Sequence, residues 1–338
     1  MSILAFLIVF GIVSIVHELG HFLTAKAFGF RILEFAIGFG PVLFKKKRGE
    51  TDYCLRALPL GGLNRFDDGE DGRGTDGRSF SRRPYYQRFL VILSGALMNI
   101  LLAVALVSVL FSVTGTPVTV IEDTVPGSPA ETSGFRKGDI ILEIDGKPML
   151  TSESIVSVLS SSSGITVDIT VERDGSIIEV PTTPAKDPAD GRGKIGIYMS
   201  AALKKTSVPV AFANGVKFLS EIIKLTISAI GRLFVGRDLE QLSGPVGIAV
   251  ASAEAARNGL SSFILLIALV SVSLGVFNLI PLPILDGGYL VFMTIEKMTG
   301  RSIPERVMSA LKLAGMAFFI LLAIYATYSD ITRIFLGR

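Results

Sequence analysis

The sequence of 338 residues contains a single cysteine, Cys54, and only two histidines. One cysteine excludes an internal disulfide and the usual zinc-finger spacings, because both need at least two. There is no basic tract with interleaved aromatic residues, and the formal net charge is only +3. Nothing in the charge pattern therefore points to a nucleic-acid partner.

Both histidines lie in one pentapeptide, HELGH at residues 17–21. On a helix, residues four apart share a face, so His17 and His21 can bind one Zn²⁺ ion. Glu18 then lies beside the metal, where it can act as general base on a zinc-bound water. Two ordinary core histidines are the alternative. Residues 3–16 carry no charge, however, and ionisable groups at membrane depth are usually functional. The pattern predicts a metalloprotease that works within the bilayer.

The composition predicts a membrane protein. Residues of hydrophobic type make up 49% of the chain, more than an ordinary soluble domain needs. Four apolar stretches are long enough, or nearly so, to cross a bilayer: 2–20 with the motif in its inner half, 89–113, 258–285 and the shorter 313–329. The first is expected to be retained and not cleaved as a signal peptide, because it lacks a basic start and a small-residue cleavage site.

The loops predict the orientation. Residues 31–88 carry twelve Lys and Arg against eight Asp and Glu, so the positive-inside rule places them in the cytoplasm. In a four-span topology the short connection 286–312 lies on the same side. The long segment between the second and third spans is then extracytoplasmic. The HELGH motif and Asp286 are both expected near the cytoplasmic face.

Residues 115–201 have the composition of a soluble domain. Alternating β-branched residues at 118–121 and 165–171 predict strands. Between them, Ser-Pro-Ala at 128–130 predicts a short helix, and Gly-Asp at 138–139 precedes an apolar strand that ends in an Asp-Gly turn. This order resembles a PDZ domain of the bacterial protease type, a module that binds an extended peptide at a sheet edge.

Two details of this insert are open. Ile-Gly-Ile at 195–197 is either a terminal strand or part of the peptide groove, and we expect the strand. Residues 184–193 are polar and predict a surface loop.

Residues 206–233 are amphipathic, with Lys217, Glu221 and Lys224 at helical spacing on one face. We expect an interfacial helix and not a fifth span, because the polar face would be costly in lipid.

Residues 35–64 form two apolar runs around a basic turn at 45–49. An open sheet of such short strands cannot cross a bilayer, because its edge groups would lack hydrogen bonds. The hairpin can lie against the protein or line a wet cavity near the site; an ordinary cytosolic hairpin is the alternative. The following stretch, 67–83, predicts a flexible loop.

These features define the expected fold class, a polytopic α-helical membrane protein with about four transmembrane helices, a membrane-associated β-hairpin region and an inserted extracytoplasmic PDZ domain of α+β type. The expected domains are 1–114, with spans one and two and the hairpin; 115–201, the PDZ domain; 202–257, a linker with the interfacial helix; and 258–338, with spans three and four.

The HELGH motif supplies two zinc ligands, and a catalytic zinc usually needs a third from the protein. Asp286 is the stronger candidate, because it ends an apolar span on the predicted side of the histidines. Pro281 and Pro283 break the helix before it and free backbone groups that can meet water or an extended substrate, and the glycines after it are expected to loosen the chain. Cys54 is a weaker alternative, since it has no partner residue at a ligand spacing.

HELGH in the first span, together with Asn-x-x-Pro-x-Pro-x-Leu-Asp-Gly at 278–287 in the third, resembles the site-2 protease family. The insert resembles the RseP-like bacterial branch of that family, with one PDZ module in place of two, and Ser-Gly-Pro-Val-Gly-Ile at 243–248 is similar to a further family motif. The resemblance covers nearly the whole chain. It implies an intramembrane zinc metalloprotease in a bacterial inner or plasma membrane.

By that resemblance, His17, His21 and Asp286 bind Zn²⁺, Glu18 is the general base, and Asn278 helps to hold the substrate or the reacting carbonyl. The hairpin region is expected to pair with an unwound substrate segment. The implied substrates are single-pass membrane proteins already cut by a site-1-type protease, such as anti-sigma factors, or remnant signal peptides.

Two other classes of function remain. A membrane metal transporter could use the same three ligands but would have little need of Glu18. An inactive PDZ scaffold anchored in the membrane would have no reason to keep a complete set of ligands and base.

Overall fold

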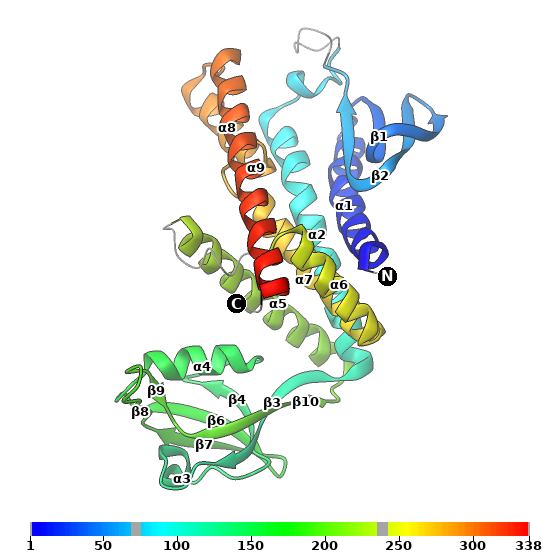
Figure 1. Ribbon diagram of the computed structural model, residues 1–338. Coiled ribbons are helices and arrows are strands. Elements are labelled where there is room, and N and C mark those ends of the chain that lie inside the picture. Colours follow the sequence, from blue (N-terminus) through cyan, green and yellow to red (C-terminus); the bar gives the residue numbers. More distant parts are fainter. Residues whose placement is uncertain (1, 69–75, 235–242, 337–338) are drawn as a thin grey trace. The chain divides into compact units, whose positions relative to one another are not determined.

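The computed structural model describes residues 2–68, 76–234 and 243–336 (Figure 1). The chain divides into two compact units. One, the helical unit, consists of Met1–Val107 and Glu221–Arg338. The other, the insert unit, is Ser108–Ser220.

Four helices of the described chain are long and apolar enough to cross a membrane: α1 (Ser2–Ala27), α2 (Tyr85–Thr114), α7 (Leu260–Asn278) and α9 (Glu305–Leu336). Helices α1, α2 and α9 each contain one of the apolar stretches expected from the sequence, and α7 lies within the fourth. Helix α7 is shorter than the stretch that predicted it, because the chain leaves the helix at Leu279, before the two prolines. Helix α5 (Val208–Phe234) covers the expected amphipathic segment and is not among these four.

Small residues let α1, α2 and α7 approach closely. A Cβ atom on Gly20 of α1 would lie 2.4 Å from the carbonyl oxygen of Ser94 in α2. A Cβ atom on Gly275 of α7 would lie 3.0 Å from the carbonyl oxygen of Ala96. Such contacts are typical of helices that pack backbone to backbone in membranes. They bring the HELGH face of α1 directly against α2.

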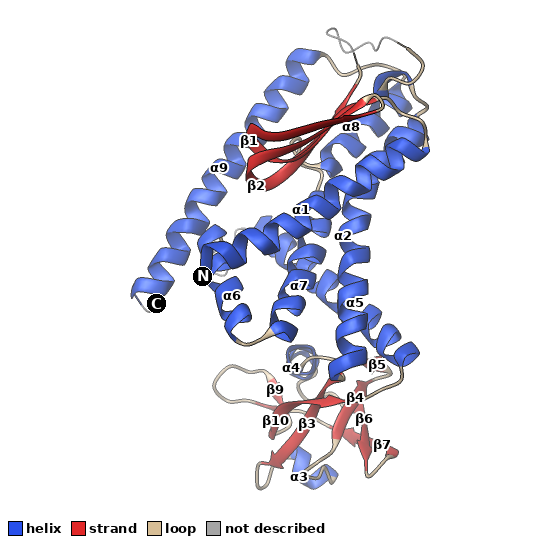
Figure 2. Ribbon diagram, turned by 90° about the vertical axis from the view of Figure 1, so that its right-hand side faces the viewer, coloured by secondary structure: helices blue, strands red, loops and turns tan. Residues whose placement is uncertain are grey.

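The 35–64 region forms two long strands, β1 (Ile32–Arg48) and β2 (Thr51–Phe66), which double back on themselves (Figure 2). Residues 34–37 have partners on two sides, at 52–55 and at 62–65. Gly38 and Gly40, both with φ of +88°, lie where β1 changes direction, in a conformation that other residues rarely adopt. The basic residues expected in the turn continue the strand to Arg48, so the turn lies at 49–50.

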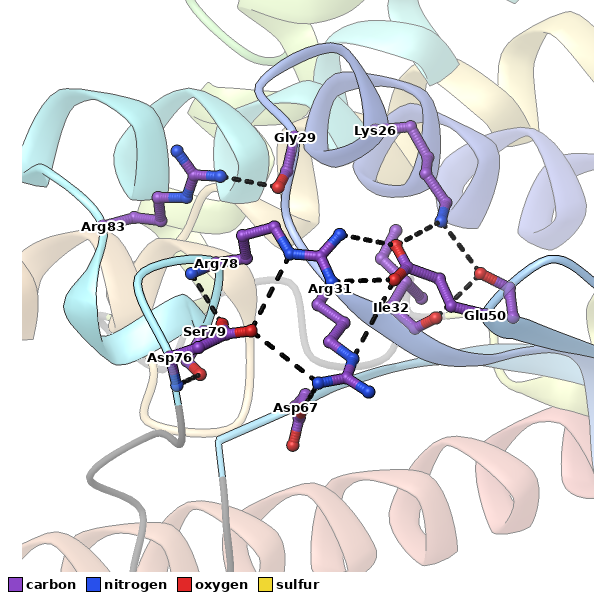
Figure 3. Close-up of polar contacts among 11 residues, drawn as sticks. Lys26, Gly29, Arg31, Ile32, Glu50, Asp67, Asp76, Arg78, Ser79 and Arg83 are labelled. Carbon is purple, nitrogen blue, oxygen red and sulfur yellow. Dashed lines mark hydrogen bonds and ion pairs between the residues drawn. The ribbon is translucent and has the colours of Figure 1, made fainter.

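A polar cluster anchors this sheet to the end of α1 (Figure 3). Lys26 of α1 donates to the Thr51 hydroxyl at 2.9 Å, and that hydroxyl donates to the carbonyl of Ile32 at 2.7 Å. Glu50 lies between Lys26 (3.7 Å) and Arg78 (3.0 Å). Arg31 contacts Asp67 at 3.1 Å. The flanks of the expected flexible loop are thus held by ion pairs; residues 69–75 lie outside the described chain.

The described part of the helical unit also contains the helices α6 (Pro245–Arg257) and α8 (Asp286–Thr299), with the 3-10 turn η1 (Phe80–Arg82) before α2. The 243–248 motif starts α6 against α9. The backbone N–H of Gly247 donates to the buried carboxylate of Asp330 at 2.7 Å. A Cβ atom on Gly244 or Gly247 would come within 3.0 Å of Asp330, so this contact requires both glycines.

The insert unit contains an antiparallel sheet of order β10-β3-β4-β6-β7, with β5 also paired to β4. The strands are β3 (Thr116–Thr124), β4 (Ile140–Ile144), β5 (Lys147–Pro148), β6 (Val167–Arg173), β7 (Ser176–Thr182) and β10 (Ile197–Lys204). Helices α3 (Pro129–Ser133) and α4 (Ser152–Ser161) accompany it. Its apolar core includes Ile121, Ile141, Ile155 and Ile169.

Local sequence explains these elements, with two differences from expectation. Ser128 caps α3 by accepting from the Glu131 N–H, and Asp145-Gly146, both at positive φ, turn the chain after β4. The expected surface loop 184–193 instead contains β8 (Ala185–Lys186), which pairs with β9 (Gly193–Lys194). Of Ile-Gly-Ile at 195–197, only Ile197 lies in the strand, because Gly196 has φ of +77°.

A buried ion pair between Asp139 and Arg173 stabilises the insert unit. Asp139 is fully buried, and its carboxylate accepts two hydrogen bonds from Arg173, at 2.8 and 2.7 Å. Burial alone would raise the pKa of the Asp139 carboxyl, but the Arg173 guanidinium and the Arg136 N–H hold it below its ordinary value. The carboxylate therefore stabilises the fold above about pH 3.9, and this contribution is lost as the pH falls through the lower folded-state pKa.

We predict that Asp139→Asn destabilises the insert by about 3 kcal/mol, because it leaves Arg173 without its buried partner. Hydrogen exchange of the β3, β4 and β6 amides in the whole protein measures this, and the acid dependence of protection should weaken in the variant. Asp187→Asn, which breaks an exposed pair with Lys194, is the control and should change little. Equal protection in wild type and Asp139→Asn would contradict the assignment.

Candidate metal centre

Helix α1 places both histidines on one face. His17 Nε2 and His21 Nε2 lie 3.2 Å apart, as expected for residues one helical turn apart. The Nδ1–H of His21 donates to the carbonyl oxygen of Val91 at 2.8 Å. A carbonyl can only accept, so this bond fixes the proton on Nδ1 and leaves Nε2 of His21 free to bind a metal.

Asp286 reaches the histidines because the chain turns back after α7. Residues 279–285 are irregular, and α8 begins at Asp286 itself. A Cβ atom on Gly287 would lie 2.3 Å from the Leu279 carbonyl oxygen, and one on Gly288 would lie 2.1 Å from that of Leu282. The expectation that these glycines loosen the chain is wrong. They allow the first turn of α8 to pack tightly on the turn before it.

Three possible ligand atoms converge here. Asp286 Oδ2 lies 3.1 Å from His17 Nε2 and 3.4 Å from His21 Nε2. A tetrahedral zinc ion with bonds of about 2.0–2.1 Å separates its ligand atoms by roughly 3.3 Å. Oδ2 is buried and makes no hydrogen bond of acceptable geometry to any described residue. The three atoms are thus spaced around a common point, as metal ligands are, and the donor set fits zinc.

Glu18 lies against strand β2. Asn64 of β2 donates from Nδ2 both to Glu18 Oε2, at 2.7 Å, and to the Glu18 carbonyl, at 3.0 Å. A Cβ atom on Gly62 would lie 2.6 Å from Glu18 Cγ, so the strand passes the side chain with no space between. The sequence analysis assigned no role to Asn64; a polar residue that follows the apolar run 57–63 is the signal that could have found it.

The other predicted residues are distributed as follows. Asn278, the last residue of α7, has Nδ2 3.5 Å from His17 Nε2 and so joins the cluster. Pro281 and Pro283 lie in the turn between α7 and α8, exposed and half-buried respectively. Cys54 is buried in the β1–β2 sheet, and the His/Asp cluster found in the described chain does not include it.

One face of α2 lines the cluster, and sequence reasoning missed it. Val91, Gly95 and Asn99 recur four residues apart on this face. Val91 accepts from His21, and Asn99 lies 3.5 Å from His17. A Cβ atom on Gly95 would lie only 2.4 Å from His21 Nε2 and 2.8 Å from His17 Cε1. Position 95 must therefore be glycine for both imidazoles to keep these places.

A model of Peptidase family M50, the site-2 protease family, matches residues 5–322. The chain belongs to this family. It is accordingly a zinc metalloprotease. The M50 match makes a transporter or an inactive scaffold the poorer interpretation.

Several relatives match this chain over nearly its whole length. A Rhizobium meliloti protein named as a zinc metalloprotease is 33% identical, over 99% of this chain and 97% of its own. Zinc metalloprotease RasP of Geobacillus kaustophilus is 30% identical, and the regulator of sigma-W protease RasP of Bacillus subtilis is 28% identical, each over 99% of both chains.

Two solved structures match about a quarter of the chain. The PDZ domains of SdrC-like proteins from Listeria monocytogenes and Listeria innocua are 23% and 25% identical, each over 24% of this chain, and cover 85% and 92% of their own chains. Both have a TM-score of 0.23.

We predict that Gly95→Ala loses zinc while the helices stay folded, because the added methyl group occupies space that His17 and His21 need. Elemental analysis of the detergent-purified protein gives zinc per chain, and circular dichroism gives the helix content. Gly231→Ala is the control, because a Cβ atom there would meet nothing within 4 Å. A full zinc content in Gly95→Ala would mean that the metal lies elsewhere.

Proposed function

We propose that the chain is an intramembrane protease that hydrolyses peptide bonds in or near transmembrane segments of single-pass membrane proteins. In this proposal His17, His21 and Asp286 hold the zinc ion and Glu18 is the general base. The observation that carries it is the spacing of the three ligand atoms, 3.1 to 3.4 Å, on apolar elements of the helical unit.

The chemistry follows from the residues around this point. Zinc, when bound, lowers the pKa of a coordinated water to about 7 and polarises a carbonyl oxygen. Glu18 accepts a proton from the attacking water and can deliver it to the leaving amine. The Asn64 amide holds the Glu18 carboxylate by its Oε2 atom. The Asn278 amide lies near His17 and, in this proposal, contacts the substrate or its reacting carbonyl.

Strand β2 offers an unwound substrate a place to bind. A helical substrate hides its amides in internal hydrogen bonds, and breaking these in lipid costs several kcal/mol for each unsatisfied group. Residues 62–65 pair with β1 on one side only among the described strands, and Gly62 lies against Glu18. A substrate segment added at the other edge would replace its lost bonds and lie beside the base. Pro281 and Pro283 would border such an extended segment.

The biological setting is inferred from relatives. One relative is named a regulator of sigma-W protease, which favours anti-sigma-factor-like substrates; remnant signal peptides are the second class. We propose that a site-1-type protease cuts the substrate first, and that the enzyme is multi-pass in a bacterial inner or plasma membrane. The excess of Lys and Arg in residues 31–88 supports a site near the cytoplasmic side and an extracytoplasmic insert.

We further propose that the insert is a PDZ domain that limits access of bulky substrates. Its composition, the capped helix α3 and the β4 strand with its Asp-Gly turn support the PDZ assignment. It contains neither histidine, so it supplies no metal ligand of that kind. Peptide binding at its sheet edge is the competing role.

We predict that Glu18→Gln keeps its zinc but cleaves a model membrane substrate orders of magnitude more slowly, because the amide cannot accept a proton. Asp286→Ala should lose zinc and activity together. Zinc per chain and cleavage rate are measured on the same preparations. Near-normal cleavage by Glu18→Gln would end the general-base assignment, and full zinc in Asp286→Ala would move the third ligand elsewhere.

We predict that removal of the insert spares cleavage of a short-ended substrate and speeds cleavage of an untrimmed one. Thr116 and Lys204 are paired at the base of the sheet, so a short Gly/Ser bridge can replace residues 116–204. Cleavage of both substrates is compared with that by the whole protein. A deletion protein that retains zinc yet cuts neither substrate would show that the insert recruits substrates and does not gate them.

A further inference from the structure

Asn99 is a buried polar side chain that the proposed mechanism does not use. It lies on α2, is fully buried, and has its amide nitrogen 3.5 Å from His17 Nδ1. Its amide oxygen is also buried and makes no hydrogen bond to any described residue. A fully buried amide is costly unless it is hydrogen-bonded, so its presence beside a candidate zinc ligand calls for a reason.

We propose that Asn99 is a positioning residue that fixes the tautomer of His17. This rests on the proposed function, in which His17 binds zinc through Nε2. A half-turn of the Asn99 amide exchanges its oxygen and nitrogen, which occupy equivalent places. With the oxygen toward the ring, it accepts from Nδ1–H, and the Nε2 lone pair of His17 is free. With the nitrogen toward the ring, Nδ1 becomes the acceptor, the proton moves to Nε2, and the metal is excluded.

His21 also has a hydrogen-bond partner on α2, and this partner allows only one tautomer. The Val91 carbonyl can only accept, so it places the proton of His21 on Nδ1. Val91 and Asn99 lie on the same face of α2, two turns apart, with Gly95 between them. One helix face thus supplies one hydrogen-bond acceptor to each of the two histidines. Such outer partners typically contribute a factor of 10–100 to metal affinity or activity.

The position of Asn99 is itself secured. Its carbonyl oxygen accepts from the hydroxyl of Ser271 on α7 at 2.8 Å, and Ser271 is fully buried. A Cβ atom added to Gly275 of α7 would lie 3.4 Å from the Asn99 Cβ, so α7 packs directly beside Asn99. The Asn99 backbone is thus held against α7, and its side chain is enclosed.

Zinc affinity tests the proposal. Asn99→Leu has nearly the same volume but no acceptor, and should weaken zinc binding by 10- to 100-fold in competition with a chelator. Asn99→Asp keeps an acceptor oxygen and should bind zinc at least as tightly as wild type. Ser252→Ala, which removes an equally buried hydroxyl of α6, is the control and should bind as wild type.

A spectroscopic readout separates positioning from packing. The chain has only two histidines, so ¹⁵N-histidine labelling of a protein purified without a polyhistidine tag gives four ring signals. In the zinc-free wild type at alkaline pH, His21 should carry its proton on Nδ1, and the share of His17 with its proton on Nδ1 should be larger than in Asn99→Leu. Asn99→Leu should redistribute the tautomers of one ring only, assigned to His17 by its loss in His17→Gln, and Asn99→Asp should restore the wild-type pattern.

The outcomes are distinct. Wild-type zinc affinity in Asn99→Leu, or equal losses in Asn99→Leu and Asn99→Asp, would overturn the positioning role. If zinc fails to shift the Nε2 signal of His17 in the wild type, the ligand assignment fails, and the role of Asn99 with it.

Discussion

The structure depends on the convergence of three atoms, His17 Nε2, His21 Nε2 and Asp286 Oδ2, within 3.4 Å of one another. They come from opposite ends of the chain, so α1 and the α7–α8 turn must meet at one point. A buried carboxylate oxygen with no hydrogen bond would be costly in apolar surroundings without a cation. A zinc ion held by these three residues would remove that cost.

The surroundings of this point consist mainly of close contacts that larger side chains would prevent. Gly20 allows α1 to meet α2, Gly95 leaves space for the imidazoles, and Gly287 with Gly288 turns Asp286 toward them. Strand β2 approaches Glu18 only because residue 62 is glycine. The polar cluster at Lys26 and Glu50 then fixes the sheet to the end of α1. Glycine is needed at these positions because a larger side chain would prevent the close contacts.

Sequence patterns predicted the parts of this arrangement that depend on local chemistry. The apolar runs predicted four helices, and the HELGH spacing with Asp286 predicted the cluster. They did not predict the contact of Asn64 with Glu18, the Val91–Gly95–Asn99 face of α2, or the doubling back of β1 and β2. Each of these depends on which distant segment lies opposite. The prediction that the glycines after Asp286 loosen the chain was wrong for another reason: glycine occurs both in flexible segments and in close packing, and here it packs on residues 279–283.

X-ray absorption spectroscopy of the zinc-loaded, detergent-purified protein tests the central claim most directly. The account predicts two imidazoles and oxygen ligands, all at about 2.0–2.1 Å, with no sulfur. His17→Gln should lose zinc, as Asp286→Ala does, so its zinc absorption edge should weaken. A sulfur neighbour at about 2.3 Å would point to Cys54, the only cysteine, and would contradict the account.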